Sequence, residues 1–291
     1  MSSDPIPRIR RFNRAVTAAV GALDASFLGR GRPLGVARVL NAIGQGQQDV
    51  AAIRSYLSLD SGLMSRLLRS LEEEGLVETV PCPDDARRRL ARLTDAGGRE
   101  FAAYEELSNA QAAGMIEGHP QPEAVLDAMD LVALALGRER ITVEEVDPAS
   151  SSARHCLGEY YAELERRFAQ GFDVSLSRDP DAADMRPPRG SFLLAAFDGL
   201  PLGCVGLKGR GGGEAEIKRL WVAPSARGLG LARRLMAAAE ERARAFSMTR
   251  LLLDTNSALA EAERLYRKDG WTEIPRFNDD PYPDLFFEKR L

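Results

Sequence analysis

The chain has 291 residues, enough for two domains of ordinary size, and its 44% hydrophobic and 28% charged residues exclude a disordered or fibrous class. The net charge of −4 excludes a general attraction to nucleic acid, so DNA binding would need a local basic patch. No apolar run is long enough to span a membrane, and the first residues lack the apolar core of a signal peptide. We therefore expect a cytoplasmic protein that makes no membrane contact.

Metal-binding chemistry is not indicated by the composition. The chain contains 2 histidines and 3 cysteines, and the cysteines lie far apart with no metal-ligand spacing. This pattern fits a reducing compartment, and we expect no metal site.

The first part of the chain is predicted to be helical. Apolar residues recur at helical spacing from Ile9 to Leu28, and Gly29-Arg30-Gly31 ends this helix. The helix has more apolar residues than one contact uses, so it needs another surface to cover it. A second helix runs from Pro33 to Ile43, since proline suits the first turn of a helix.

The next two helices have the pattern of a DNA-binding unit. A short helix around Ile53 is followed by a turn in which Asp60 or Ser61 can cap the next helix. Leucines then recur at helical spacing from Leu63 to Leu71. They leave an outward face of small polar residues and arginines, which suits a DNA major groove. This face comprises Ser61, Gly62, Ser65, Arg66, Arg69 and Ser70.

A β-hairpin with arginines at its tip follows this helix. The predicted strands are Leu76–Val80 and Arg87–Leu93, joined by a turn over residues 81–86. By itself, the run Arg87–Arg89 is typical of a solvated surface. Its place directly after an outward-facing polar helix favours a DNA contact instead.

Residues 8–138 resemble the MarR family of winged-helix regulators. The motifs that carry the resemblance are Asp49-Val50-Ala51, Ser65–Glu72, Gly75-Leu76-Val77, the wing Pro83–Arg87 and Leu93–Gly97. The resemblance implies a winged helix that binds double-stranded DNA. It also implies that Arg87 enters the minor groove, with the carboxylate of Asp85 orienting it.

The same resemblance implies a homodimer formed through the terminal helices, here residues 9–28 and about 95–137. This arrangement would give their surplus apolar faces a partner. One motif departs from the family, because Gly62-Leu63-Met64 stands where small β-branched or hydroxyl residues are more common. Sequence selectivity would then rest more on the wing and on DNA shape.

The periodicity changes near Gly137. From Thr94 to Gly137 the pattern is helical, with a break at residues 118–120, whereas Ile141–Val146 has the composition of a strand. We therefore expect an N-terminal domain over residues 1–138 and a C-terminal domain over residues 139–291. The short linker predicts that the two domains touch.

The C-terminal domain is predicted to be mixed α/β. A helix over residues 150–170 and a loop over 177–190 precede strands at 191–197, 202–207 and 215–222. A helix, a strand at 250–255 and a helix at 258–268 complete the pattern.

A strand, a glycine-containing turn and a helix follow one another from Ile217 to Phe246. Leu220-Trp221-Val222 is typical of a buried strand, and apolar residues recur at helical spacing from Leu231 onward. The first turn of a helix leaves backbone N–H groups unpaired, and Gly228 and Gly230 let an anion approach the backbone. The turn therefore predicts a diphosphate site; an ordinary strand–helix turn with two glycines is the alternative.

Two other phosphate loops do not fit this stretch. No G-x-x-x-x-G-K-[ST] occurs, and Arg233 stands where the dinucleotide fingerprint needs its third glycine. Residues 140–291 instead resemble the GNAT N-acetyltransferase family. The resemblance rests on Arg227, Gly230 and Ala232 in the pattern [QR]-x-x-G-x-[GA], on the preceding Leu220–Pro224, and on Asp254-Thr255-Asn256 and Ala262–Trp271.

The GNAT resemblance implies acetyl-CoA as acetyl donor and an amine as acceptor. The diphosphate would lie on the N–H groups of the turn, and the pantetheine arm would pair with the strand edge. One strand N–H would also stabilise negative charge on the thioester oxygen. The implied cofactor residues are Leu220, Trp221, Val222, Arg227, Gly228, Leu229, Gly230, Leu231, Ala232, Asn256 and Ala262; Asn256 is alternatively a helix cap.

Tyr266 is the candidate acid for the departing thiolate. It follows Ala258 and Ala262 at helical spacing, on a face of small residues that a cofactor arm can approach. A core tyrosine is the alternative. Glu216 is the candidate base, because the family often has a carboxylate there that acts through water. A salt bridge to Lys218 or Arg219 is the alternative role for Glu216, and His155 or a water is the alternative base.

The residues Phe277–Tyr282 combine aromatic and acidic side chains in one turn. An amine acceptor would find stacking and counter-charge there, although a solvated loop is equally consistent with the pattern. The leading hypothesis is an acetyl-CoA-dependent N-acetyltransferase that also binds DNA. The alternatives are a regulator whose GNAT domain only senses acetyl-CoA or a ligand, and a winged helix that serves only dimerisation.

Overall fold

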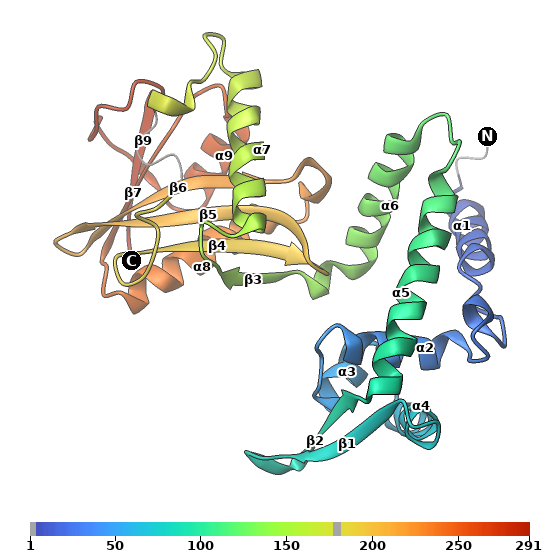
Figure 1. The fold of residues 1–291 in the computed structure, drawn as a ribbon. Coiled ribbons are helices and arrows are strands. Elements are labelled where there is room, and N and C mark those ends of the chain that lie inside the picture. Colours follow the sequence, from blue (N-terminus) through green and yellow to red (C-terminus); the bar gives the residue numbers. More distant parts are fainter. Residues whose placement is uncertain (1–3, 177–181) are drawn as a thin grey trace. The chain divides into compact units, whose positions relative to one another are not determined.

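The computed structural model describes residues 4–176 and 182–291 (Figure 1). The chain divides into two compact units, Met1–Pro122 and Glu123–Leu291, which are described separately below. The domain boundary predicted after residue 138 stays a prediction. The expected loop over residues 177–190 lies partly outside the described residues.

The N-terminal unit is a helical bundle with a two-stranded wing. Its core includes residues from three successive helices, among them Val39, Leu40, Ile53, Met64, Leu68 and Leu71. The elements in order are α1 (Pro5–Ala19), α2 (Leu34–Gly44), α3 (Val50–Tyr56), α4 (Ser61–Glu73), β1 (Val77–Cys82), β2 (Asp85–Leu93) and α5 (Asp95–Ile116).

The expected helix from Ile9 to Leu28 is wrong at its C-terminal end. Helix α1 ends at Ala19, and Gly21 then adopts a positive φ of 63°, which a helix does not accommodate. A separate short 3-10 turn, Phe27–Gly29, follows. No residue of α1 is buried within this unit. The apolar side chains of α1 are therefore available to a further surface, as the sequence predicts.

Helix α5 begins where its first turn packs against the end of α4. The hydroxyl of Thr94 accepts the N–H of Gly97 at 3.0 Å and donates to the carbonyl of Gly75 at 2.7 Å. This capping residue satisfies a helix donor that would otherwise lack a partner. Gly97 then lies so close to Leu76 that a Cβ would overlap the Leu76 carbonyl.

The C-terminal unit is a seven-stranded mixed sheet in the order β3-β4-β5-β6-β7-β9-β8. The pair β6–β7 is parallel, and every other neighbouring pair is antiparallel. The elements are α6 (Pro122–Gly137), β3 (Thr142–Glu145), α7 (Ser151–Arg167), β4 (Gly190–Phe197), β5 (Leu200–Gly211), β6 (Glu214–Val222), α8 (Leu231–Ala245), β7 (Arg250–Thr255), α9 (Ala260–Lys268), β8 (Thr272–Glu273) and β9 (Leu285–Arg290).

Both faces of the sheet are covered, as the layers in Figure 1 show. On β4, Phe192 and Leu194 belong to the core under α7, whereas Leu193 and Ala195 belong to the core under α8. Successive side chains of a strand point to opposite faces, so a strand buried on both sides is a continuous apolar run. This explains why residues 191–197 are almost entirely apolar.

Strands β6 and β7 pair only over their first residues. The parallel register runs from Glu214↔Arg250 to Ile217↔Leu253 and stops there. Just beyond, Arg219 has a positive φ of 58°, and the register of β6 against β5 shifts between Cys204 and Gly206. This is a β-bulge, which bends one strand away from its neighbour. The two strands therefore separate after Ile217 and leave an edge of β6 without a partner strand.

The contact between Gly97 and Leu76 gives a test of the N-terminal core. We expect Gly97→Ala to destabilise the protein by about 1–3 kcal/mol, since its Cβ would displace the backbone of Leu76. The neighbouring Gly98, in the same helix turn, has open space around its Cβ direction. Gly98→Ala should therefore stabilise by up to about 1 kcal/mol. Urea unfolding measures both; equal effects would contradict the packing described.

Candidate active site and nucleic-acid interface

A cavity of about 80 Å³ lies where β6 and β7 separate, and we call it the split cavity. Strand β6 contributes Lys218, Arg219 and Leu220 to its wall, and β7 and the next residues contribute Asp254, Thr255 and Asn256. The remaining lining residues used below are Tyr160 and Phe168 from α7, Phe172, Ala262 and Tyr266 from α9, and Asp280 and Tyr282 from the loop before β9.

The turn before α8 has the geometry that the glycines predict. Gly228 and Gly230 adopt positive φ values of 80° and 75°, and Gly230 is the residue that caps α8. Among the described residues, no acceptor is bonded to the backbone N–H groups of residues 228–233. A Cβ at either glycine would meet only open space. The start of α8 therefore presents a row of free donors, which is the arrangement that binds an anion.

The arginines around this turn are exposed, but each is bonded to another group of the protein. Arg227 donates to the carbonyl of Val222 at 3.0 Å and to the carboxylate of Glu163 at 2.5 Å. Arg233 is paired with Asp269, and Arg234 donates to the carbonyl of Ile141 at 2.7 Å. The donors that face solvent at the turn are thus backbone N–H groups, and Arg227 holds the turn in shape.

Five of the predicted cofactor residues lie outside the turn before α8. Leu220, Asn256 and Ala262 line the split cavity. The side chain of Trp221 turns to the opposite side, where its ring N–H donates to Glu163 at 3.1 Å, and Val222 is buried under α8. Asn256 donates to the carbonyl of Tyr282 at 2.6 Å and accepts the N–H of Ala258 at 2.9 Å. Its amide thus fastens the loop ahead of α9, but the N-cap of this helix is Leu259, so Asn256 is not the helix cap of the alternative.

Tyr266 lies in the wall of the split cavity between two other rings. Its ring centroid is 6.1 Å from that of Trp271 and 5.9 Å from that of Phe287, and the residue is 5% exposed. No side chain or backbone group in the described ranges is hydrogen-bonded to its hydroxyl. Burial raises the pKa of the Tyr266 phenol above its usual value, because the charged form loses its hydration. The hydroxyl therefore stays protonated in the neutral range.

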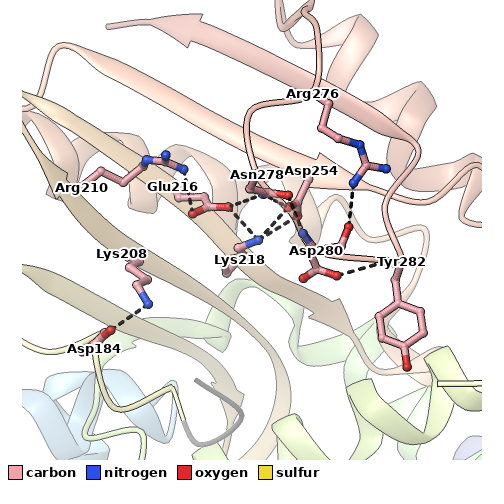
Figure 2. Close-up of polar contacts among 10 residues, drawn as sticks. All are labelled: Asp184, Lys208, Arg210, Glu216, Lys218, Asp254, Arg276, Asn278, Asp280 and Tyr282. Atoms are coloured by element: carbon pink, nitrogen blue, oxygen red, sulfur yellow. Dashed lines mark hydrogen bonds and ion pairs between the residues drawn. The ribbon is translucent and has the colours of Figure 1, made fainter. Parts of the chain in front are cut away.

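Glu216 is part of a buried network of charges (Figure 2). The ammonium of Lys218 lies 2.7 Å from Glu216 and 2.8 Å from Asp254. Arg210 approaches Glu216 at 3.4 Å, and Asn278 donates to Asp254 at 2.6 Å. Glu216 is therefore a salt-bridge partner of Lys218, the alternative to a free base. Among these residues, Lys218 and Asp254 line the split cavity.

Burial alone would lower the pKa of Lys218, but the attraction of Asp254 and Glu216 outweighs it and raises the pKa. Lys218 thus stays charged and holds both carboxylates in place. His155, the alternative base, lies on an exposed position of α7 and does not line the split cavity.

Helix α4 presents the outward face that its leucines predict. Met64, Leu68 and Leu71 are buried, and Asp60 caps the helix by accepting the N–H of Leu63 at 2.8 Å. The opposite side carries Ser61, Gly62, Ser65, Arg66 and Arg69, all exposed.

The three arginines of the wing differ in their contacts. Arg88 is paired with Asp49 at 2.7 Å, and Arg89 donates to the hydroxyl of Thr79 at 2.6 Å. Arg87 is exposed and has no ion pair with any residue that the structure describes. Asp85 accepts the backbone N–H of Arg87 at 3.0 Å, so in this structure it orients the chain of the wing rather than the guanidinium.

Comparison with known proteins gives matches in both units. Residues 157–271 match the acetyltransferase (GNAT) family model. An IAA acetyltransferase of Azospirillum brasilense is 36% identical over 134 residues, which are 44% of this chain and 86% of the relative. The chain belongs to the GNAT acetyltransferase family. An uncharacterized N-acetyltransferase of Schizosaccharomyces pombe is 34% identical over 43% of this chain and 82% of its own length.

Comparison with solved structures also gives matches. An acetyltransferase of the GNAT family from Staphylococcus aureus covers 52% of this chain and 98% of its own, with 18% identity and a TM-score of 0.46. Residues 30–88 match the MarR family model, so the N-terminal unit carries a MarR winged-helix DNA-binding domain. Across the residues described, the structure contains no helix both long and apolar enough to cross a membrane.

Several residues of the GNAT site were not singled out from the sequence. Glu163 receives bonds from both Trp221 and Arg227, across more than fifty positions of chain, and no local pattern marks it. Asp254 belongs to a recognised motif, but its contact with Lys218 depends on the register of β6 against β7. Tyr160 is part of an apolar helical stripe, and nothing in that stripe distinguishes a cavity residue from a core residue.

Proposed function

We propose that the GNAT unit is an acetyl-CoA-dependent N-acetyltransferase that acts on a primary amine. The observation that carries the proposal is the row of free N–H groups at residues 228–233, in the turn that follows β6 and the start of α8; Leu220 of β6 lines the split cavity. These donors fit a diphosphate, and the open edge of β6 fits the amide-bearing pantetheine arm. The small side chain of Ala262 leaves room for that arm.

The chemistry requires one bond to form and one to break. Bound acetyl-CoA would supply the acetyl group as a thioester; its acyl carbon becomes bonded to the amine nitrogen, and its C–S bond breaks. An ammonium first loses one proton to reach the nucleophilic amine, and a second proton leaves the nitrogen as the amide forms. Tyr266 holds a proton at its hydroxyl for the departing sulphur, and the second amine proton restores the phenol through the site.

The proton that leaves the ammonium needs an acceptor at the split cavity. We assign this role to Asp254, which lines the cavity, whereas Glu216 does not line it and is paired with Lys218. We infer that Glu216 contributes by holding Lys218 and Asp254 in place and takes up a proton only through water. The backbone N–H groups of β6 beyond the bulge would stabilise negative charge on the thioester oxygen.

Blocking the turn tests the cofactor site. We expect Gly230→Glu to abolish acetyl-CoA binding in calorimetric titration, because the side chain would fill the anion site and repel the diphosphate. Gly270→Glu is the control, since Gly270 also has a positive φ of 81° and open space but lies beyond α9. It should bind like wild type. Equal binding by Gly230→Glu, or none by wild type, would contradict this assignment.

Removing one hydroxyl tests the acid. We expect Tyr266→Phe to lower kcat about 100-fold or more with an unchanged Kd for acetyl-CoA. The amine for this assay comes from a thiol-release screen. Burial raises the pKa of Tyr266 above about 10, the usual pKa of a tyrosine. The higher kcat of wild type relative to Tyr266→Phe should therefore persist up to about pH 10. Tyr160→Phe, in the same cavity, should lower kcat much less. An equal decrease in kcat would contradict a specific role of Tyr266.

We propose that the MarR unit binds double-stranded DNA through α4 and the wing, as a homodimer. The exposed apolar side chains of α1, at Ile6, Ile9, Phe12 and Val16, support a second copy as the covering surface. The presence of a MarR unit is also consistent with the alternative function, a transcription regulator whose GNAT unit only senses acetyl-CoA. Acetyl-CoA binding without thiol release in the presence of any amine would identify the sensor.

Charge removal tests the DNA interface. We expect Arg66→Ala and Arg87→Ala each to weaken DNA binding and to reduce the slope of log affinity against log salt by about 1. Arg88→Ala is the matched control, because the Arg88 guanidinium is already paired with Asp49. Its effect should be smaller. Fluorescence anisotropy over a salt series measures the slopes, and unchanged slopes for Arg66→Ala and Arg87→Ala would contradict the interface.

A further inference from the structure

Part of the split cavity wall is a cluster of aromatic rings. Phe168, Phe172 and Tyr282 contact one another, with ring centroids 4.6 Å apart for Phe172 and Tyr282 and 6.0 Å apart for Phe168 and each of the other two. Tyr160 lines the cavity beside them. Aromatic faces carry negative potential and attract alkylammonium groups, while their area packs against methylene groups. This wall therefore suits the carbon chain of a cationic amine.

The carboxylate of Asp280 completes this wall. It lines the split cavity, and its one bonded partner in the described chain is the backbone N–H of Tyr282, at 3.2 Å. Figure 2 shows Arg276 reaching the backbone carbonyl of Asp280 rather than its carboxylate. The other cavity carboxylate, Asp254, is neutralised by Lys218. Lys218 and Arg219 also line the cavity, but Asp280 forms no ion pair with either of them or with any other described residue.

The loop that carries Asp280 is held in place. The hydroxyl of Tyr282 accepts the backbone N–H of Asp173 at 2.8 Å, and the carbonyl of Tyr282 accepts the amide of Asn256 at 2.6 Å. Further along, Asp284 accepts the hydroxyl of Ser257 at 2.6 Å. The carboxylate and the rings are therefore fixed before a ligand arrives, which lowers the entropy lost on binding.

The volume of the split cavity limits the shape of the amine. An apolar cavity of about 150 Å³ accepts benzene, and about 80 Å³ is roughly half of that. The same space must also receive the acetyl group. Because the cavity is open on one side, this limit applies to the groups next to the nitrogen: a ring or a branch there would crowd the acetyl group, whereas an unbranched chain would enter by its narrow end and leave the rest of its length at the open side.

We propose that the acceptor is a primary amine at the end of an unbranched alkyl chain, with Asp280 as counter-ion of its ammonium and the ring cluster around its methylene groups. This inference rests on the proposed acetyltransferase function. A primary amine at the end of an unbranched chain occurs in free alkylamines and in lysine side chains. In the reaction, Asp280 selects and places the cation, and proton removal follows at the site.

Equilibrium binding tests the proposal without turnover. The probes are 1-aminobutane, 1,5-diaminopentane, Nα-acetyl-lysine methylamide, 2-methyl-2-aminopropane and alanine methylamide, each titrated by calorimetry into the full-length protein saturated with CoA. The first three should bind, and the last two, which are branched next to nitrogen, should bind at least 10-fold more weakly. Binding of the lysine derivative alone would indicate a protein acceptor; binding of the free amines would indicate a small molecule. No binding of any unbranched amine, or preference for the branched ones, overturns the proposal.

Charge substitution tests the counter-ion. Asp280→Asn should raise the Kd and KM for the unbranched amine at least 10-fold while leaving kcat and the Kd for acetyl-CoA close to wild type. Asp279→Asn, at the next position but outside the cavity lining, is the matched control and should behave like wild type. Equal effects of the two substitutions overturn the role of Asp280. If the wild-type protein did not bind acetyl-CoA, that result would instead contradict the proposed acetyltransferase function.

Discussion

The separation of β6 and β7 is the constraint on which the GNAT unit depends. Two parallel strands that stayed paired would bury their edges against each other and leave no room between them. The bulge at Arg219 ends the pairing after Ile217 and opens both a cavity and a strand edge. Everything proposed for catalysis lies around this opening. The positive φ of Arg219 costs conformational energy, and a site is where such strain is commonly retained.

Buried charges in this protein mainly hold the site in shape. Glu163 accepts bonds from Trp221, Arg227 and Arg167, and so fastens the turn before α8 to α7. Lys218 similarly joins the ends of β6 and β7 where they diverge. A buried pair contributes little net stability, but losing one member leaves an uncompensated charge. These pairs therefore act as positioning devices, and Asp280 differs from them because it forms no ion pair with a described residue.

The elements were largely predictable because their signals are local. Helical leucine spacing in α4, the apolar run of β4 and the glycines at 228 and 230 each depend on a few neighbouring residues, and the structure has all three elements. The helix at the N-terminus was predicted too long, because apolar spacing continues past Gly21 although the chain turns there. Residues of the site that come together through sheet register or helix packing, such as Glu163, were beyond the reach of local patterns.

The internal bonds of the arginines at the start of α8 have a consequence for how salt would act on each unit. Under the proposed function, a diphosphate would be held by fixed backbone dipoles at residues 228–233, because Arg227, Arg233 and Arg234 are engaged elsewhere. Few mobile counterions would leave that turn when the ligand arrives. In contrast, the proposed DNA interface would use solvated arginines and would displace ions from DNA. Under these two proposals, a rise in ionic strength would weaken DNA binding more than it weakens cofactor binding.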